Sequence, residues 1–335
     1  MIRTLKMLAC ALVLCVTASA QSLNGAGATF PNPIYQKWFT EYSSAHPGVQ
    51  INYQSLGSGA GIRQVIAGTV DFGASDGPMS DEQLSQCPGK VLHIPTVLGA
   101  VVPAYNIPGV KQELKFTPDL LAGIFLGKIT NWNDGAIAKV NPGVRFPSQA
   151  IVVVHRSDGS GTSYVFTDYL SKVSPEWNST VGKSTSVKWP VGLGGKGNEG
   201  VAGTIRQIEG SIGYVELIYA VQNNISYGVV RNKRGNFVKA SLESTTAAAA
   251  AAAANMPADY RVSITDPEGK EAYPIASFTW LLIPQQSRDG NKGRVLRDFL
   301  SWMLKDGQRQ AASLSYAPLP KEVTKKLLTT INTIH

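Results

Sequence analysis

Apolar residues recur along the chain with two periods, one typical of strands and one typical of helices. Apolar and polar positions alternate in residues 49–53 and largely in 70–74, while residues 151–154 form a continuous β-branched run. These three segments predict strands. Helical spacing predicts one face of a first helix, formed by Ile34, Trp38, Phe39 and Tyr42. Residues 25–31, just before this helix, are rich in glycine and predict a turn.

Loops of small residues stand between these strands and the helices that follow them. They fall at residues 29–30, 57–61, 75–77 and 156–162. Strand–loop–helix units predict an α/β fold with a largely parallel sheet. Ligands of such sheets bind at the carboxyl ends of the strands. The four loops are therefore candidate parts of one site.

Longer patterns complete the outline of the fold. Apolar stretches at 91–105 and 273–283 are candidate crossings between two lobes, and Thr117 with Pro118 predicts a helix start. The eight alanines 247–254 predict a helix, either on the surface or as a tolerated insertion. Further helices are predicted at 62–67, 164–170, 294–304, 308–314 and 321–331, and after the cap Ser80.

A glycine-rich segment, residues 192–197, matches G-x-G-x-x-G. The acidic residue that a dinucleotide site needs about 20 residues later is met only loosely, by Glu216. A nucleotide is also an implausible ligand for an exported protein, and residues 1–20 predict export. We interpret the segment as a tight turn before a helix at 200–209.

The first 20 residues have the pattern of a secretory signal peptide. Arg3 and Lys6 precede an apolar run at 7–16, and Ala18-Ser19-Ala20 is a cleavage signal. The mature chain is expected to begin near Gln21, outside the cytoplasm. Lipid attachment at Cys10 or Cys15 is a poorer alternative, because Leu14 is too large a residue before Cys15 and Cys10 leaves a very short apolar region. We expect a periplasmic protein without a lipid anchor.

Composition excludes several classes of function. Cys87 is alone once the signal is removed, and the histidines lack metal-ligand spacing. We therefore expect no metal site and no cofactor. The net charge of +8, or +6 without Arg3 and Lys6, is dispersed. The densest groups, 231–234 and 321–326, resemble solvated turns or helix faces, so we expect no nucleic-acid partner but a mild attraction for small anions.

Residues 156–163 (Arg-Ser-Asp-Gly-Ser-Gly-Thr-Ser) follow a strand and open a helix. Backbone N–H groups and the dipole at a helix N-terminus favour an anion there. Arg156 offers a planar fork that fits oxyanions. Asp158 could hold Arg156, although an ordinary helix cap remains an alternative.

Donors for a tetrahedral oxyanion occur in several of the candidate loops. Hydroxyl groups come from Thr29, Ser58, Ser160 and Thr162. Backbone N–H groups come from Phe30, Gly161 and Thr162.

Asp76 is a carboxylate among these donors. It would repel an anion unless the ligand carries a proton to donate. Phosphate carries one at neutral pH and sulfate does not, so an acceptor here would select phosphate. The alternative is an Asx turn before Gly77-Pro78.

An enzymatic alternative rests on Ser75. Residues 73–77 match the G-x-S-x-G nucleophile elbow and follow a predicted strand. However, Pro78 interrupts the helix entry, and nothing ties His93 or His155 to Ser75 as a base. We expect no catalytic residue, and a secreted serine hydrolase is the lesser alternative.

Seven segments, in order along the chain, resemble the periplasmic phosphate-binding proteins of phosphate-specific ABC transporters. They are residues 25–31, 70–76, 126–129, 158–163, 188–192, 213–216 and 273–275. His155, where the family often has arginine, and the alanines 247–254 depart from its pattern.

The resemblance implies a fold and a site. The fold is a two-lobed α/β periplasmic binding protein of type II, with residues 21–100 plus 282–335 in lobe 1, 101–281 in lobe 2, and two crossing strands. Phosphate lies between the lobes, and the implied ligand positions are Thr29, Phe30, Ser58, Asp76, Arg156, Asp158, Ser160, Gly161 and Thr162.

The resemblance also implies partners. A monomeric receptor would deliver phosphate to the permease subunits of an ABC importer in the membrane. A binding protein for sulfate or molybdate is the alternative within this class, and Asp76 argues against it.

Overall fold

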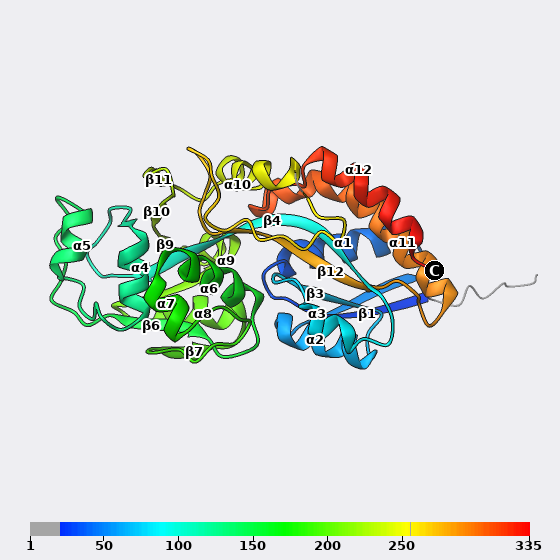
Figure 1. Ribbon diagram of the computed structural model, residues 1–335, viewed down its shortest axis with the longest axis horizontal. Helices are drawn as coiled ribbons and strands as arrows, with labels where there is room; N and C mark the ends of the chain where they lie inside the picture. The colour runs from blue at the N-terminus through cyan, green and yellow to red at the C-terminus, as the bar shows by residue number, and fades with distance from the viewer. Residues whose placement is uncertain (1–20, 255) are drawn as a thin grey trace, which may run out of the picture.

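Two sheets that share one long strand organise the protein (Figure 1). The computed structural model describes residues 21–254 and 256–335, so the predicted signal peptide lies outside the described residues. The shared strand is β4 (Val91–Asn106), which pairs through residues 91–100 with β12 (Ala276–Pro284) and through 101–106 with β8 (Ser211–Glu216). Both predicted crossing segments are thus strands, and the fold is a two-lobed α/β fold.

The lobe 1 sheet has the order β2-β1-β3-β12-β4. The first three strands are parallel, and β12 runs antiparallel to both neighbours. These strands are β1 (Gln21–Gly27), β2 (Val49–Ser55) and β3 (Phe72–Ser75). The helices of this lobe are α1 (Asn32–Ala45), α2 (Ser58–Ala67), α3 (Asp81–Ser85), α11 (Gly290–Lys305), η1 (Gly307–Leu314), α12 (Lys321–Thr330) and η2 (Ile331–Thr333).

The lobe 2 sheet continues from β4 in the order β4-β8-β6-β7, and β9 (Ser226–Tyr227) also pairs with β4. Strands β6 (Val152–Arg156), β7 (Leu193–Gly195) and β8 are mutually parallel. A small outlying sheet contains β5 (Lys115–Phe116), β10 (Val229–Arg231) and β11 (Phe237–Val238). The helices are α4 (Pro118–Phe125), α5 (Gly135–Val140), α6 (Gly161–Val173), α7 (Pro175–Thr180), α8 (Gly197–Gln207) and α9 (Leu217–Gln222).

The alanine run belongs to α10 (Leu242–Ala254), which packs on β4 and β12 (Figure 1). Ala248 and Ala249 are buried there. The helix prediction is confirmed, but the helix is not only a surface feature, because small side chains let it approach the crossing strands closely.

The lobe boundaries stay proposals. We propose that the chain leaves lobe 1 within β4 at residues 100–101, where the pairing partner changes from β12 to β8. We place its return near Ala276 rather than at 282, because β12 pairs with residues 91–100 of β4 along its whole length and with β3 at residues 280–282.

Several local predictions are confirmed. Ser80 forms a capping box with Gln83. Thr117 caps α4 ahead of Pro118, and this helix ends at Phe125, just short of Gly127.

Four local predictions need correction. Residues 25–27 are the end of β1 and not a turn, and residues 193–195 form β7 beside β6. Helix α8 begins at Gly197, three residues earlier than predicted, and residues 307–314 form a 3₁₀ helix. Glycine at position 25 weakens the strand pattern, so the sequence did not predict strand β1. Glycine is required there because a Cβ would lie 2.1 Å from the Phe72 ring.

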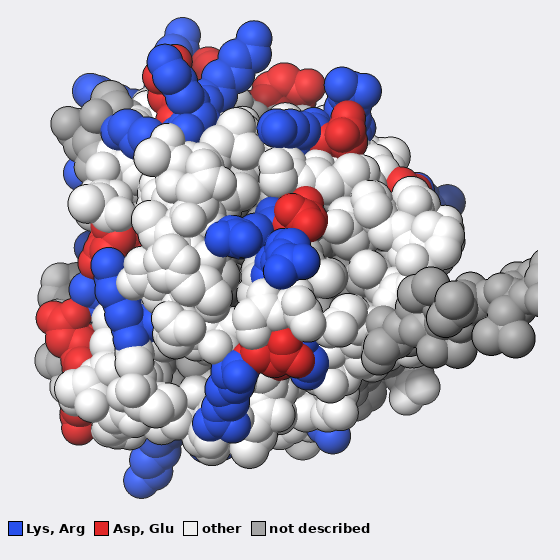
Figure 2. All heavy atoms as spheres, turned by 90° about the vertical axis from the view of Figure 1, so that its right-hand side faces the viewer, with Lys and Arg blue, Asp and Glu red and all other residues white. Residues whose placement is uncertain are grey.

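Charged side chains are spread over the face shown in Figure 2, with Asp and Glu among Lys and Arg. None of the helices within residues 21–254 and 256–335 combines the length and hydrophobicity that a membrane span needs.

Candidate anion-binding site

The structure brings the nine predicted site residues together where the lobes meet. Eight of them are buried and Asp158 is half-buried. They come from the ends of β1, β3 and β6 and from the starts of α2 and α6. The carboxyl ends of parallel strands thus meet the N-termini of helices, as the loop pattern predicts.

On the lobe 1 side, Asp76 lies directly after β3 and is 1% exposed. Its N–H donates to Ser58 Oγ at 3.2 Å, and its Oδ1 accepts from Thr279 Oγ1 at 2.8 Å. Burial raises the pKa of Asp76 to about 7, although Thr279, the charge of Arg156 and Ser58 oppose the shift. A carboxyl with this pKa can exchange a proton with a ligand near neutral pH.

On the lobe 2 side, Arg156 ends β6, and its side chain is 1% exposed. Nε and Nη2 donate to the two carboxylate oxygens of Asp158 at 2.8 and 2.5 Å, and Nη1 donates to Thr162 Oγ1 at 3.3 Å. Burial alone would raise the pKa of Asp158, but the hydrogen bonds and charge of Arg156 outweigh it and lower the pKa. Asp158 therefore stays ionised and fixes the guanidinium, as predicted.

Ser160 caps α6, since its Oγ accepts the Ser163 N–H at 3.0 Å. The N–H groups of Gly161 and Thr162 precede the first intrahelical bond and have no acceptor within the described residues. The positive end of a 13-residue helix thus faces the same region as Arg156.

The lobes are in close contact around this site. A Cβ on Gly161 would lie 2.4 Å from both Asp76 Oδ2 and Ser58 Oγ. The Gly59 N–H donates to the Gly159 carbonyl at 2.8 Å, which joins the α2 loop of lobe 1 to the α6 loop of lobe 2. The two halves of the predicted site are therefore adjacent, although they lie far apart in sequence.

Sequence reasoning missed Asn198, which is fully buried in the first turn of α8. Its Nδ2 lies 2.8 Å from Thr29 Oγ1 and 3.0 Å from Thr162 Oγ1, and its Oδ1 accepts the Glu216 N–H. Asn198 thus joins the two lobes across the site. The glycine-rich segment 192–197 could have pointed to Asn198, because α8 begins at the end of this segment and its N-terminus lies at the site.

Neither His93 nor His155 is bonded to Ser75 as a base in the described part of the chain. Its Oγ donates to the Gly77 carbonyl at 2.5 Å, while His93 Nε2 accepts the Met79 N–H. The Nδ1 of His155 lies 3.0 Å from the Arg156 carbonyl. Among the described residues, no group of three or more His, Cys, Asp or Glu side chains could hold a metal ion.

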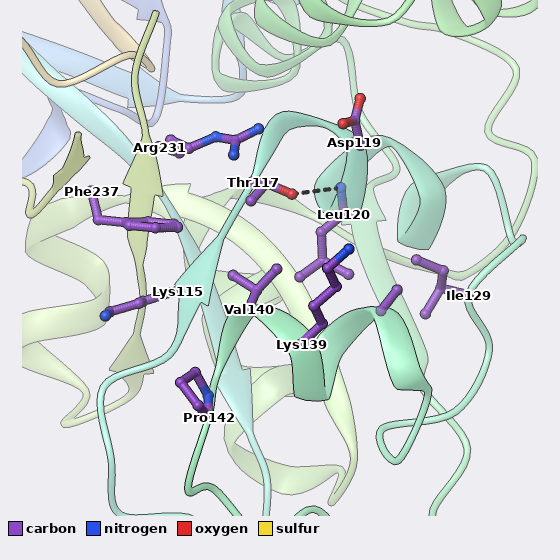
Figure 3. A pocket seen from close by; sticks show the side chains of 11 residues that line it. Lys115, Thr117, Asp119, Leu120, Ile129, Lys139, Val140, Pro142, Arg231 and Phe237 are labelled. Carbon is purple, nitrogen blue, oxygen red and sulfur yellow. Dashed lines mark hydrogen bonds between the residues drawn. The ribbon is translucent and has the colours of Figure 1, made fainter. Parts of the chain in front are cut away.

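A groove of about 600 Å³ lies away from this site, between α4, α5 and the small sheet of lobe 2 (Figure 3). Lys115, Lys139 and Arg231 surround its apolar lining, and the Thr117 hydroxyl there accepts the Leu120 N–H. None of the nine predicted site residues lines this groove. The groove is therefore separate from the candidate anion site.

Comparison with known proteins identifies the family. The PBP superfamily domain matches residues 16–306. The chain is 48% identical over 313 residues to the phosphate-binding protein PstS of Pasteurella multocida (strain Pm70), covering 93% of this chain and 90% of the relative. The chain belongs to the PstS family.

More distant members of this family also align over nearly the whole chain. The PstS of Methanocaldococcus jannaschii is 38% identical over 331 residues, covering 92% of this chain and 85% of the relative. The solved structure of the periplasmic phosphate-binding protein PfluDING with bound phosphate has a TM-score of 0.74 at 22% identity, covering 92% and 93% of the two chains. At that identity the solved structure supports the two-lobed fold.

Proposed function

We propose that this protein is an extracytoplasmic receptor that binds inorganic phosphate between its lobes and delivers it to an ABC importer. The observation that carries the proposal is the convergence of donors from both lobes around one buried carboxylate, Asp76. The PstS relatives are named phosphate-binding proteins, which supports the same ligand.

The donors account for binding of a dehydrated oxyanion. Arg156 supplies positive charge, while Thr29, Ser58, Ser160 and Thr162 supply hydroxyl groups and the two helix N-termini supply N–H groups. Hydrogen bonds to a charged group contribute about 1.5–3 kcal/mol each. Three or four of them, after ordering costs, correspond to micromolar affinity, which is about −8 kcal/mol.

Asp76 supplies the selectivity in this proposal. Its carboxylate accepts the proton of HPO₄²⁻ or H₂PO₄⁻, which sulfate and molybdate cannot offer at neutral pH. Asp76 is only 1% exposed, so its repulsion of an anion that carries no proton would be costly. The alternative oxyanions are therefore disfavoured by the same group that favours phosphate.

Delivery requires the lobes to close on the anion and to release it. Contacts from both lobes give the bound anion a differential affinity for the closed state. The shared strand β4 and the neighbouring β12 are the connections about which the lobes would move.

The signal-like N-terminus supports export to the periplasm without a lipid anchor. We propose that the receptor acts as a monomer and docks on the permease subunits of the importer. No catalytic role is proposed, and the PstS relatives are named as binding proteins.

Isothermal titration calorimetry with phosphate and sulfate tests this function. Phosphate is expected to bind at micromolar concentration or below, and sulfate at least about 10³-fold more weakly. Equal affinities would contradict the selectivity assigned to Asp76, and tighter binding of sulfate or molybdate would favour the other oxyanion class. Ester turnover that Ser75→Ala abolishes, without phosphate binding, would favour the hydrolase.

A further inference from the structure

Three consecutive backbone carbonyls in the loop after β1 each accept a hydrogen bond from a tyrosine. Tyr53 donates to Ala28 O at 2.7 Å, Tyr219 to Thr29 O at 2.5 Å and Tyr316 to Phe30 O at 2.6 Å. The three tyrosines come from β2, from α9 and from the segment after η1. Separate elements therefore converge on one short loop, residues 28–30.

The geometry of the peptide bond links these carbonyls to the anion site. In a trans peptide, the C=O of one residue points opposite to the N–H of the next. Holding Ala28 O and Thr29 O therefore aims the N–H groups of Thr29 and Phe30 to the other side. Neither N–H has an acceptor in the described part of the chain, although Thr29 is 2% exposed and Phe30 is fully buried. Buried backbone donors normally have a partner, so these two are available for a ligand.

Contacts of the Thr29 side chain support the direction inferred for the Thr29 and Phe30 N–H groups. Thr29 Oγ1 is bonded to Asn198, which also contacts Thr162 of the α6 N-terminus. The loop thus lies between the tyrosines on one side and the anion donors on the other.

Tyrosine suits this task because it donates a hydrogen bond without adding charge. Burial raises the pKa values of Tyr53, Tyr219 and Tyr316 well above the ordinary value, so all three hydroxyls stay protonated. Donation to a carbonyl also polarises the N–H of the same peptide through hydrogen-bond cooperativity. A lysine in the same place would leave a competing positive charge beside the anion.

We propose that Tyr53, Tyr219 and Tyr316 are positioning residues for the anion site, which hold residues 28–30 so that the Thr29 and Phe30 N–H groups face the ligand. This inference rests on the proposed phosphate binding.

Tyr219 has a second role in the proposal. It belongs to lobe 2, whereas Thr29 belongs to lobe 1, so its hydroxyl completes the loop only when the lobes are in contact. Its oxygen also lies 3.1 Å from Glu199 Oε1, the longer of its two contacts. Tyr316 donates to the carbonyl of the peptide between Phe30 and Pro31. Pro31 has no N–H, so Tyr316 holds the end of the loop without orienting an N–H group itself.

Tyrosine-to-phenylalanine variants test the proposal, since each removes one hydroxyl and keeps the ring. Tyr53→Phe, Tyr219→Phe and Tyr316→Phe are each expected to raise the Kd for phosphate about three- to thirtyfold in calorimetry. The matched control is Tyr273→Phe, whose buried hydroxyl donates to the Val101 carbonyl at 2.9 Å, outside the loop. The control is expected to change Kd less than about twofold, which corresponds to a small part of one hydrogen bond.

Amide hydrogen exchange without phosphate provides a second readout that loss of general stability would not produce. Tyr219→Phe is expected to speed exchange of the Phe30 N–H, and Tyr53→Phe that of the Thr29 N–H, relative to both in Tyr273→Phe. Affinity losses no larger than the control's, or exchange that is unchanged at both amides, would overturn the positioning role. A wild-type protein that binds no phosphate would instead contradict the proposed function, while exchange still decides the positioning.

Discussion

Asp76 is a buried carboxyl whose protonation matters both for the ligand and for the fold. The Thr279 hydroxyl donates a hydrogen bond to the Asp76 carboxylate, and the Asp76 N–H donates one to Ser58 Oγ. The two bonds hold Asp76 in place. Burial nevertheless raises its pKa to about 7. The cost of burying the negative charge of Asp76 is removed when a ligand donates a proton to the carboxylate. It is also removed when an amide replaces the carboxylate.

The substitution Asp76→Asn tests the selectivity at the residue scale. It replaces one carboxylate oxygen by an NH₂ donor and removes the negative charge, while the shape of the side chain is kept. Sulfate affinity at pH 8 is expected to rise to within about tenfold of phosphate affinity, because the repulsion of a fully ionised anion is removed. Calorimetry with both anions measures the ratio. The control is Asp134→Asn, a helix cap on α5 where asparagine also caps well; a ratio unchanged from wild type in Asp76→Asn would contradict the assignment.

The raised pKa also predicts a pH dependence of stability without ligand. Asp76 binds its proton more tightly in the folded state, so its stabilising effect is complete below pH of about 4 and is lost as the pH rises to about 7. Urea unfolding should therefore show a free energy of unfolding that falls by a few kcal/mol across this range. Asp76→Asn should flatten the fall; an identical slope in both proteins would show that the carboxyl is not the cause.

At the scale of elements, Asp168 anchors α6, whose first turn supplies the anion donors. It is 1% exposed and accepts from Lys183, Ser263 and Thr265 at 2.7, 2.6 and 2.5 Å. Burial alone would raise its pKa, but these bonds and the charge of Lys172 outweigh burial and lower the pKa to about 2. The helix is thus held to the segment that leads into β12.

The substitution Asp168→Ala is expected to lower the free energy of unfolding by about 2–4 kcal/mol, because it leaves buried hydroxyl donors without an acceptor. The loss should be largest above pH 4 and should become smaller as the pH falls through about 2, since a lowered pKa means that the ionised form is the more stabilised one. Urea unfolding at several pH values measures both. The control is Asp306→Ala, which removes an exposed pair with Arg309; equal losses in the two variants would refute the anchoring role.

Elements with strong periodicity could be predicted from sequence, and elements built on glycine could not. Helix α1 and strands β2, β3 and β6 lie where apolar spacing predicts them. Strand β1 was missed because it ends in Gly25, Ala26 and Gly27; a Cβ on Gly25 would meet the Phe72 ring, and one on Gly27 would meet the Ala74 backbone. Strand β7 was missed for a similar reason, since two of its three residues are glycine.

The same limit applies to the site. Hydroxyls and arginine in strand-end loops carried enough chemistry to be chosen from sequence. Asn198 and Thr279 did not, because their roles depend on which residues of distant segments face them in the fold. The tyrosines of the loop 28–30 come from positions 25 to 286 residues away in sequence, so no local pattern connects them.

At the scale of the whole molecule, the proposed phosphate binding requires a close approach of the two lobes. Gly59 and Gly159 face each other there, with a Cβ built on Gly59 lying 3.0 Å from Gly159 Cα. Gly59 lies inside α2 and has ordinary helical backbone, so its helix tolerates a side chain, and the two closest atoms that a Cβ would meet belong to Gly159 of the other lobe.

The substitution Gly59→Val is therefore expected to hold the lobes apart. Phosphate affinity should fall at least about tenfold, and the radius of gyration measured by small-angle scattering with phosphate should stay larger than that of wild type. The control is Gly203→Val in α8, where a Cβ would meet nothing within 4 Å. Wild-type affinity in Gly59→Val would contradict a requirement for this contact.

The position of β12 between β3 and β4 also determines when the sheets can form. The chain is synthesised from its N-terminus, yet residues 276–284 complete the sheet that residues 21–100 begin. Until they emerge, β3 and the first half of β4 have unpaired edges, which invite pairing with other chains. The strands β8, β6 and β7 are all present much earlier. Lobe 2 can therefore fold first, and the lobe that begins the chain is the last to be completed.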